Sequence, residues 1–360
     1  MPSKLYFTPG PAQLYFTAES HIKDGLRKDI ASISHRSTEF KSIFELAVDN
    51  LKQVLNLPEG YHSCFTSSAT EIWERIAQSL ILKQSHHFVN GSFAEKFETI
   101  VQQCNKKTES TKTGFGTPFK DLGVSPHSDL ISVTYNETSC GFQFTQEQLK
   151  KLRDDFPEKL IALDIVSAAP ATAIDLSLVD TAYFSVQKCF GLPAGLGVWI
   201  YNDRCLKRAE EVMSQNISTG SYHSLLELHT SASKNQTPAT PNVLGIYTLA
   251  KVAGDMMQKG LPMMHRDTLY KSAILYQMAD SLNWMKPFIS EKANRSKTVC
   301  VFELEEDNDW LIDRMEASHI SLGKGYGPFS KQHIRIANFP THSKEQIELL
   351  VDLISASSPK

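Results

Sequence analysis

Two charged residues that end apolar segments are the first candidates for chemistry in this chain of 360 residues. The segment Leu160-Ile-Ala-Leu-Asp164 ends in a carboxylate. The segment from Asp180 to Lys188 ends in an amine, and the small-residue turn Gly191-Leu-Pro-Ala-Gly195 follows it. In an open α/β sheet, ligands bind beyond the carboxyl ends of the strands, so both groups are expected to face one crevice.

Pyridoxal 5'-phosphate is a cofactor that needs this pair of groups. Its aldehyde is held by a lysine as a Schiff base, and its ring nitrogen is kept protonated by a carboxylate. Lys188 would take the first role and, once displaced by a substrate amine, would serve as the general base. Asp164 would take the second role. A lone lysine after a strand is usually a solvated strand end, so the hypothesis depends on the Asp164 segment and the turn after Lys188.

Seven apolar, β-branched stretches surround this pair and alternate with helical patterns such as 71–81 and 94–101. This alternation predicts an α/β fold with a mainly parallel seven-stranded sheet that helices cover on both faces. The predicted strands are His62–Thr66, His86–Asn90, Lys107–Thr111, Leu130–Tyr135, Leu160–Ile165, Thr181–Val186 and Leu196–Tyr201.

After Pro241 the pattern changes to long helical stretches. We therefore predict a large cofactor-binding domain of residues 1–240 and a smaller C-terminal α+β domain of residues 241–360. The elements predicted for the smaller domain are helices Asn242–Gln258 and Leu269–Met285, strands Lys297–Leu304 and His333–Phe339, and an amphipathic helix Ser343–Ile354.

The bulk composition is typical of a globular protein, with 41% hydrophobic residues, 21% charged residues and a net charge of −3. This near balance argues against a nucleic-acid-binding protein, which would carry a basic stripe. No apolar run approaches the length of a membrane span, and the N-terminal segment lacks the apolar core of a signal peptide. The six cysteines show no metal-type spacing, so we expect reduced thiols, no metal site and a cytoplasmic protein.

Seven further blocks occur in a fixed order around the lysine segment. They are Phe7-Thr-Pro-Gly10-Pro11-Ala, Ile33-Ser-His35-Arg36-Ser37-Thr-Glu-Phe, Phe65-Thr-Ser67-Ser68-Ala69-Thr70-Glu, Asn90-Gly-Ser-Phe93-Ala, Tyr135-Asn136-Glu137-Thr138, Gln236-Thr237-Pro-Ala-Thr240-Pro and Ile334-Arg335-Ile-Ala-Asn. Each block alone is a weak signal, but together they span nearly the whole chain. The chain resembles the class V, fold type I, pyridoxal-phosphate aminotransferases. Gln187, before the lysine, is similar to the phosphoserine aminotransferase branch, whereas cysteine desulfurases usually have histidine there.

The resemblance implies a set of cofactor-binding residues on two subunits of a homodimer. Ala69 and Thr70, at the start of a helix, would donate hydrogen bonds to the cofactor phosphate. Phe93 stands where the family usually has a tryptophan stacked on the pyridine ring, and it keeps an aromatic face. The full set is Ser68, Ala69, Thr70, Phe93, Thr138, Asp164, Gln187, Lys188, Gln236 and Thr237.

Four members of this set have more specific implied roles. Thr138 would bind the phenolic oxygen of the cofactor or the nearby carboxylate, and Gln187 would approach the same oxygen. Gln236 and Thr237 would reach across the dimer interface to the neighbouring subunit's cofactor phosphate. The family usually has asparagine at the position of Gln236.

Two cationic points are predicted to bind substrate. Arg335, flanked by apolar residues on a predicted strand, would hold the α-carboxylate with its planar fork. Arg36, with His35, would hold a distal anion such as the side-chain carboxylate of glutamate. The phosphoserine branch also has a His-Arg pair shortly before Arg335. This chain lacks that pair, and Lys331 and His333 are the candidates to replace it.

The resemblance implies transamination of O-phosphoserine with 2-oxoglutarate to 3-phosphooxypyruvate and glutamate, a reaction of serine biosynthesis. A second reading keeps the same core but uses small substrates, as in serine– or alanine–glyoxylate or pyruvate transamination. Cysteine desulfuration is less favoured, because it needs a cysteine on an exposed loop whereas Cys300 lies in an apolar strand. An α/β binding protein without catalysis conflicts with the presence of both Asp164 and Lys188.

Overall fold

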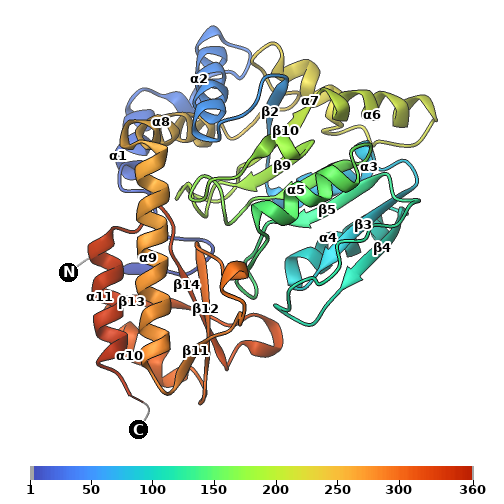
Figure 1. Ribbon diagram of the computed structural model, residues 1–360. Coiled ribbons are helices and arrows are strands. Elements are labelled where there is room, and N and C mark those ends of the chain that lie inside the picture. Colours follow the sequence, from blue (N-terminus) through green and yellow to red (C-terminus); the bar gives the residue numbers. More distant parts are fainter. Residues whose placement is uncertain (1–3, 359–360) are drawn as a thin grey trace.

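A seven-stranded sheet forms the centre of the computed structural model, which describes residues 4–358 (Figure 1). Residues 1–3, where the N-terminal segment considered above begins, and residues 359–360 lie outside this range. The strands are, in spatial order, β2 (Tyr61–Thr66), β10 (Gly197–Asn202), β9 (Thr181–Ser185), β8 (Leu160–Asp164), β5 (Leu130–Thr134), β3 (Gln84–Val89) and β4 (Lys107–Lys112). β10 pairs antiparallel with both of its neighbours, and the other four pairings are parallel. The predicted mainly parallel sheet of seven strands is confirmed.

Helices cover both faces of this sheet, because the central strands are apolar on both sides. On β9 the side chains alternate, so that Phe184 packs with one helical layer and Tyr183 with the other. The first layer consists of α2 (Thr38–Val54), α5 (Gln146–Asp155) and α8 (Val243–Lys259). The second layer consists of α3 (Ala69–Leu80), α4 (Ser92–Gln103), α6 (Asp203–Ser214) and α7 (Leu225–Ala232).

A second sheet of five strands lies below the first one in Figure 1 and has its own apolar core. Its strands are, in spatial order, β1 (Leu5–Phe7), β13 (Ile320–Lys324), β14 (His333–Ala337), β12 (Val299–Leu304) and β11 (Met285–Pro287). Its helices are α9 (Leu261–Ser281), α10 (Asp309–Ala317) and α11 (Lys344–Ser355). The short elements are the hairpin β6 (Asn136–Glu137) and β7 (Phe142–Gln143), and the 3₁₀ turns η1 (Ile30–Ser32), η2 (Leu176–Leu178), η3 (Lys292–Asn294) and η4 (Gly327–Phe329).

Two elements make contacts across the boundary predicted at residue 240. The N-terminal strand β1 pairs parallel with β13, so the start of the chain joins the C-terminal sheet. Helix α8 packs against α2 and against α1 (Ala18–Arg27), which belong to the first half of the sequence. The division of the chain at residue 240 stays a prediction.

The helix predicted at Leu269–Met285 has different bounds in the structure. α9 begins at Leu261, immediately after Gly260, which ends α8 with a positive φ of 86°. Pro262 occupies the first turn, where a missing N–H costs nothing, so it starts the helix and does not break it. At the other end, Met285 already belongs to β11.

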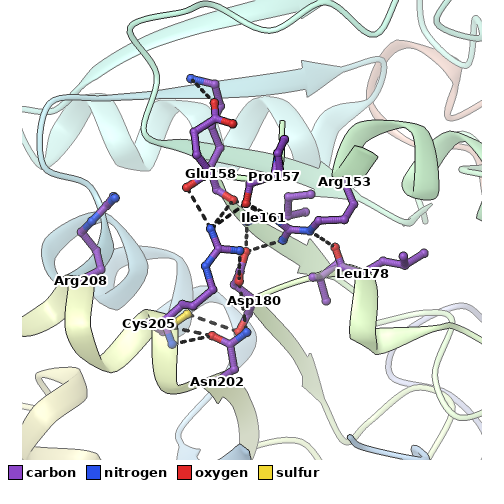
Figure 2. Close-up of polar contacts among 12 residues, drawn as sticks. Arg153, Pro157, Glu158, Ile161, Leu178, Asp180, Asn202, Cys205 and Arg208 are labelled. Atoms are coloured by element: carbon purple, nitrogen blue, oxygen red, sulfur yellow. Dashed lines mark hydrogen bonds and ion pairs between the residues drawn. The ribbon is translucent and has the colours of Figure 1, made fainter. Parts of the chain in front are cut away.

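A cluster of charges surrounds the buried Asp180 at the amino-terminal ends of the parallel strands, opposite to their carboxyl ends (Figure 2). Asp180, directly before β9, accepts hydrogen bonds from Arg153 of α5 (2.5 Å), Arg204 of α6 (3.0 Å) and Asn202 (3.1 Å). Its Oδ2 also accepts the backbone N–H of Ile161 (2.8 Å). The carboxylate thus ties two strands to helices of both layers.

Among residues 4–358, no helix combines the length and the apolar character that crossing a membrane needs.

Candidate active site

Lys188 lies in the loop after β9 with its amine buried in the protein. Its Nζ donates a hydrogen bond to Thr138 Oγ1 at 2.9 Å and lies 5.1 Å from the centre of the Phe93 ring. Gly10 packs against the lysine side chain, and a Cβ there would lie 3.1 Å from Lys188 Cε. Gly10 also has a φ of 153°, which L-residues rarely adopt, so glycine fits this position on two counts.

Asp164 ends β8, the strand beside β9, as predicted. Its Oδ1 accepts the backbone N–H of Val166 at 2.9 Å. Burial raises the pKa of Asp164 and lowers the pKa of Lys188, and the charge of each residue partly opposes the shift of the other. An acid and a base whose pKa values are moved towards neutrality from opposite sides are typical of a functional site.

Seven of the predicted cofactor residues line one cavity at the carboxyl ends of the strands. The cavity is lined by Ala69, Thr70, Trp73, Phe93, Thr134, Asn136, Thr138, Asp164, Val166, Ser185, Gln187 and Lys188. The structure therefore brings the predicted amine, carboxylate, aromatic ring and hydroxyl groups together. Their roles towards a cofactor stay predictions.

Helix α3 begins at this cavity. Ser68 caps the helix, because its Oγ accepts the N–H of Glu71 at 3.1 Å. The next N–H, of Ala69, is bound by Ser185 Oγ at 2.7 Å, which ties the start of the helix to β9. Ala69 and Thr70 line the cavity, so the positive end of the helix dipole is directed to it.

Thr138 connects three parts of the site. Its hydroxyl accepts from Lys188 and donates to Ser167 Oγ at 2.9 Å, and its carbonyl accepts from Arg335 Nη1 at 3.3 Å. Arg335 lies on β14 of the second sheet, so this contact brings the C-terminal part of the chain to the edge of the cavity. The guanidinium of Arg335 also lies 5.4 Å from the ring of Tyr326, which in turn is 5.4 Å from the Phe93 ring.

The other predicted residues lie together in a different place. Arg36 donates to Gln236 Oε1 at 3.3 Å and to the Pro238 carbonyl at 3.5 Å. His35 is half-buried beside it, and burial lowers its pKa. Thr237 is buried next to a hollow that Ser67 also lines, and its hydroxyl donates to the Ala239 carbonyl. None of these residues lines the Lys188 cavity of the same chain.

The two candidates to replace the missing His-Arg pair differ in whether they can carry a charge. Lys331 is exposed and lies 3.5 Å from the Asp307 carboxylate. His333 is buried between the rings of Phe288 and Phe329, and burial lowers its pKa to about 4. His333 is therefore neutral near pH 7, so the sequence-based suggestion that it supplies this charge is wrong, whereas the same suggestion for the exposed Lys331 stays a prediction.

Cys300 and Cys189, the two cysteines weighed for desulfuration, do not offer the accessible nucleophile that a desulfurase needs. Cys300 lies in β12 and is fully buried, and Cys189 next to the lysine is also buried. Burial raises the pKa of both thiols and keeps them protonated.

The sequence did not single out several residues that line the cavity. Trp73 lies one helical turn after Ala69, so the spacing along α3 could have placed it on the same face. Ser185 alternates with Phe184 on β9, which could have directed it to the cavity side. Asn136 stands in a quoted motif, and its side chain donates to Ser167 Oγ at 2.7 Å.

The family model described as aminotransferase class-V matches residues 11–315 of this chain. Among curated proteins, the phosphoserine aminotransferase of Rhodococcus opacus is 27% identical over 338 residues, which cover 89% of this chain and 86% of the relative. The phosphoserine aminotransferase of Corynebacterium glutamicum is 27% identical over 364 residues, covering 98% of this chain and 94% of the relative.

Solved structures of aminotransferases are also similar to this chain. A phosphoserine aminotransferase from Cytophaga hutchinsonii is 38% identical, with a TM-score of 0.97 and full coverage of both chains. An aspartate aminotransferase from Thermus thermophilus is 19% identical, with a TM-score of 0.86 and 98% coverage of both chains. This second likeness shows a shared fold only.

Proposed function

The chain belongs to the class V aminotransferase family and is a transaminase, and we propose that it transfers the amino group of O-phosphoserine to 2-oxoglutarate with pyridoxal 5'-phosphate as cofactor. The products would be 3-phosphooxypyruvate and glutamate, in a step of serine biosynthesis. The observation that carries the proposal is the meeting of Lys188 and Asp164 in one cavity. The choice of substrate is supported by the 38% identity to the Cytophaga hutchinsonii phosphoserine aminotransferase over the whole chain.

The residues of the cavity fit the proposed cofactor. A buried amine and a buried carboxylate match its aldehyde and its ring nitrogen, and Thr70 at the positive end of the α3 dipole matches its phosphate, whereas the Ala69 N–H is already bound by Ser185 Oγ. Gln187 Oε1 is buried without a hydrogen-bond partner among residues 4–358. Such a group is costly to leave unsatisfied, and a polar ligand in the cavity would supply the missing partner.

When bound, the cofactor would supply an electron sink that makes the Cα–H of an amino-acid substrate acidic. The chain's own groups then have defined tasks. Lys188 would move the proton at Cα, since burial lowers its pKa towards neutrality and leaves a larger fraction of the amine free to accept a proton. The carboxylate of Asp164 would stabilise a proton on the ring nitrogen. The resulting cationic N–H would in turn keep Asp164 ionised. Phe93 would cover one face of the ring and exclude water from it.

Substrate binding would use two arginines from two subunits. Arg335 lies at the edge of the cavity and would hold the α-carboxylate of any amino acid. Arg36, Gln236 and Thr237 lie together on one chain and away from that chain's own cavity. This supports a homodimer in which they complete the neighbouring subunit's site. Arg36 would then be a cation for a distal phosphate or carboxylate, because His333 is neutral near pH 7 and Lys331 lies on the surface beside the Asp307 carboxylate.

A screen of single half-reactions tests the proposal. The cofactor-loaded protein is mixed with O-phosphoserine, glutamate, alanine or serine, and the absorbance of the cofactor is followed. We expect conversion by O-phosphoserine and glutamate to be faster than conversion by alanine or serine. Preference for alanine or serine, with no response to O-phosphoserine, would instead favour glyoxylate- or pyruvate-type transamination.

A further inference from the structure

A fully buried glutamate joins two segments of the cavity wall. Glu137 Oε2 accepts the backbone N–H groups of Phe93 at 3.1 Å and Ala94 at 3.0 Å. Its Oε1 accepts the N–H of Ser139 at 3.0 Å and the hydroxyl of the same residue at 2.6 Å. All four bonds go to one carboxylate that has no exposed surface.

The start of α4 explains why the carboxylate is placed there. The residue before the helix is Gly91, which has no side chain to bind the free N–H groups of the first turn. Ser139 Oγ accepts the N–H of Ser92 at 3.0 Å, and Glu137 accepts the next two. The helix is therefore capped by residues some 45 positions later in the chain, and the negative charge lies at the positive end of the helix dipole.

Gly91 makes this arrangement possible by its lack of a Cβ. A Cβ at this position would lie 2.3 Å from Glu137 Cγ and 2.8 Å from Ser139 Oγ. The close approach of the loop before α4 to the carboxylate thus depends on a glycine. The loop, the glutamate and Ser139 behave as one packed unit beside the cavity.

The position of the Phe93 ring is the functional consequence of this unit. Phe93 is the second residue of α4, its N–H is bound by Glu137, and its ring lines the cavity 5.1 Å from the Lys188 amine. We propose that Glu137 is a positioning residue that fixes the backbone of Phe93, so that the ring is held in place for the pyridine ring of the cofactor. This inference rests on the proposed function. Glu137 itself touches neither cofactor nor substrate in this account.

The chain offers a matched control for a purely structural role. Asp180 is also a buried carboxylate with several donors, but it lies at the opposite ends of the strands (Figure 2). Loss of either carboxylate leaves buried donors unsatisfied and lowers the free energy of unfolding. Only the donors of Glu137 line or adjoin the cofactor cavity.

The test measures the affinity of the apoprotein for pyridoxal 5'-phosphate by absorbance titration. Glu137→Gln keeps the size of the side chain but replaces one acceptor oxygen by an NH₂ group. This group is itself a donor, so it cannot bind the N–H groups that the oxygen accepted. We expect a rise in Kd of roughly 10- to 150-fold, the equivalent of a lost charge-assisted hydrogen bond. Asp180→Asn should leave this Kd unchanged although it lowers the urea midpoint of unfolding.

A double-mutant cycle separates positioning from general destabilisation. If Glu137 acts through the ring, Glu137→Gln should have little further effect on the Kd in a Phe93→Leu background. An equal loss in both backgrounds, or a wild-type Kd in Glu137→Gln, would overturn the inference. Should Glu137→Gln not fold, Ser139→Ala removes one partner of the same carboxylate, and its cycle with Phe93→Leu decides in the same way. Wild-type protein that does not bind the cofactor would overturn the proposed function and this inference with it.

Discussion

The Arg335 side chain leads to a quantitative prediction about every amino-acid substrate. Its Nε donates to the Lys324 carbonyl at 2.7 Å and its Nη1 to the Thr138 carbonyl at 3.3 Å. Since a guanidinium has five N–H donors, three remain, and they include both on Nη2 and one on Nη1. These can bind the two oxygens of a carboxylate in the bidentate manner that favours arginine over lysine.

Arg335→Lys should therefore keep the charge but lose at least one of the two bonds to the carboxylate. A hydrogen bond to a charged group contributes roughly 1.5–3 kcal/mol, so kcat/KM should fall roughly 10- to 150-fold. The loss should be similar for glutamate, alanine and O-phosphoserine, because all of them have an α-carboxylate. Half-reaction rates measured from the absorbance of the cofactor give these values directly.

Arg295 provides a matched control for this substitution. Its Nε also donates to a backbone carbonyl, of Ile289 at 2.9 Å, and its guanidinium lies 5.3 Å from the Tyr276 ring. It does not line the cavity, so Arg295→Lys should leave kcat/KM unchanged. A loss confined to glutamate and O-phosphoserine in Arg335→Lys, or no loss at all, would refute the assignment to the α-carboxylate.

Four other substitutions have expected outcomes. Lys188→Ala should abolish transamination while the protein still folds, and an active variant would show that the lysine is not the proton carrier. Arg36→Ala should slow glutamate and O-phosphoserine much more than alanine, and equal slowing of all three would remove its role at a distal anion. Asp180→Asn should lower the free energy of unfolding by roughly 3–5 kcal/mol in urea titrations, because it breaks a buried ion pair with Arg153; a change well below 1 kcal/mol would contradict this. His333 has a folded pKa of about 4, lowered by burial from about 6.5, so stability should be lost as the pH falls below 6.5. His333→Phe should reduce that loss by roughly 1–3 kcal/mol at pH 4.5, and an unchanged pH profile would contradict it.

The sequence predicts the large sheet well for a physical reason. Strands such as β8 are buried on both faces, so they appear as short apolar runs between helical patterns. The strand β1 has only three residues, and its place is decided by pairing with β13 more than 300 residues later. No local pattern carries that information.

The candidate site also has one part that the sequence predicts and another part that it does not predict. Asp164 and Lys188 follow neighbouring strands, and a parallel sheet brings such strand ends together at one edge. The role of Glu137 depends on a contact with α4, which lies about 45 residues earlier, and periodicity does not report such contacts. The suggestion for His333 failed because residue type does not reveal burial: His333 packs against two aromatic rings and loses its charge.

The central claim is that Lys188 carries the cofactor, and one measurement tests it most directly. The protein is loaded with pyridoxal 5'-phosphate, reduced with borohydride and digested, and the peptides are mapped by mass spectrometry. We predict a yellow protein that borohydride bleaches, with the covalent pyridoxyl label on Lys188. Lys271 is an internal comparison, since burial lowers its pKa to about 8, but its amine is bound to the carbonyls of Phe339 and His342. A label on Lys271, or a colourless protein without any label, would contradict the account.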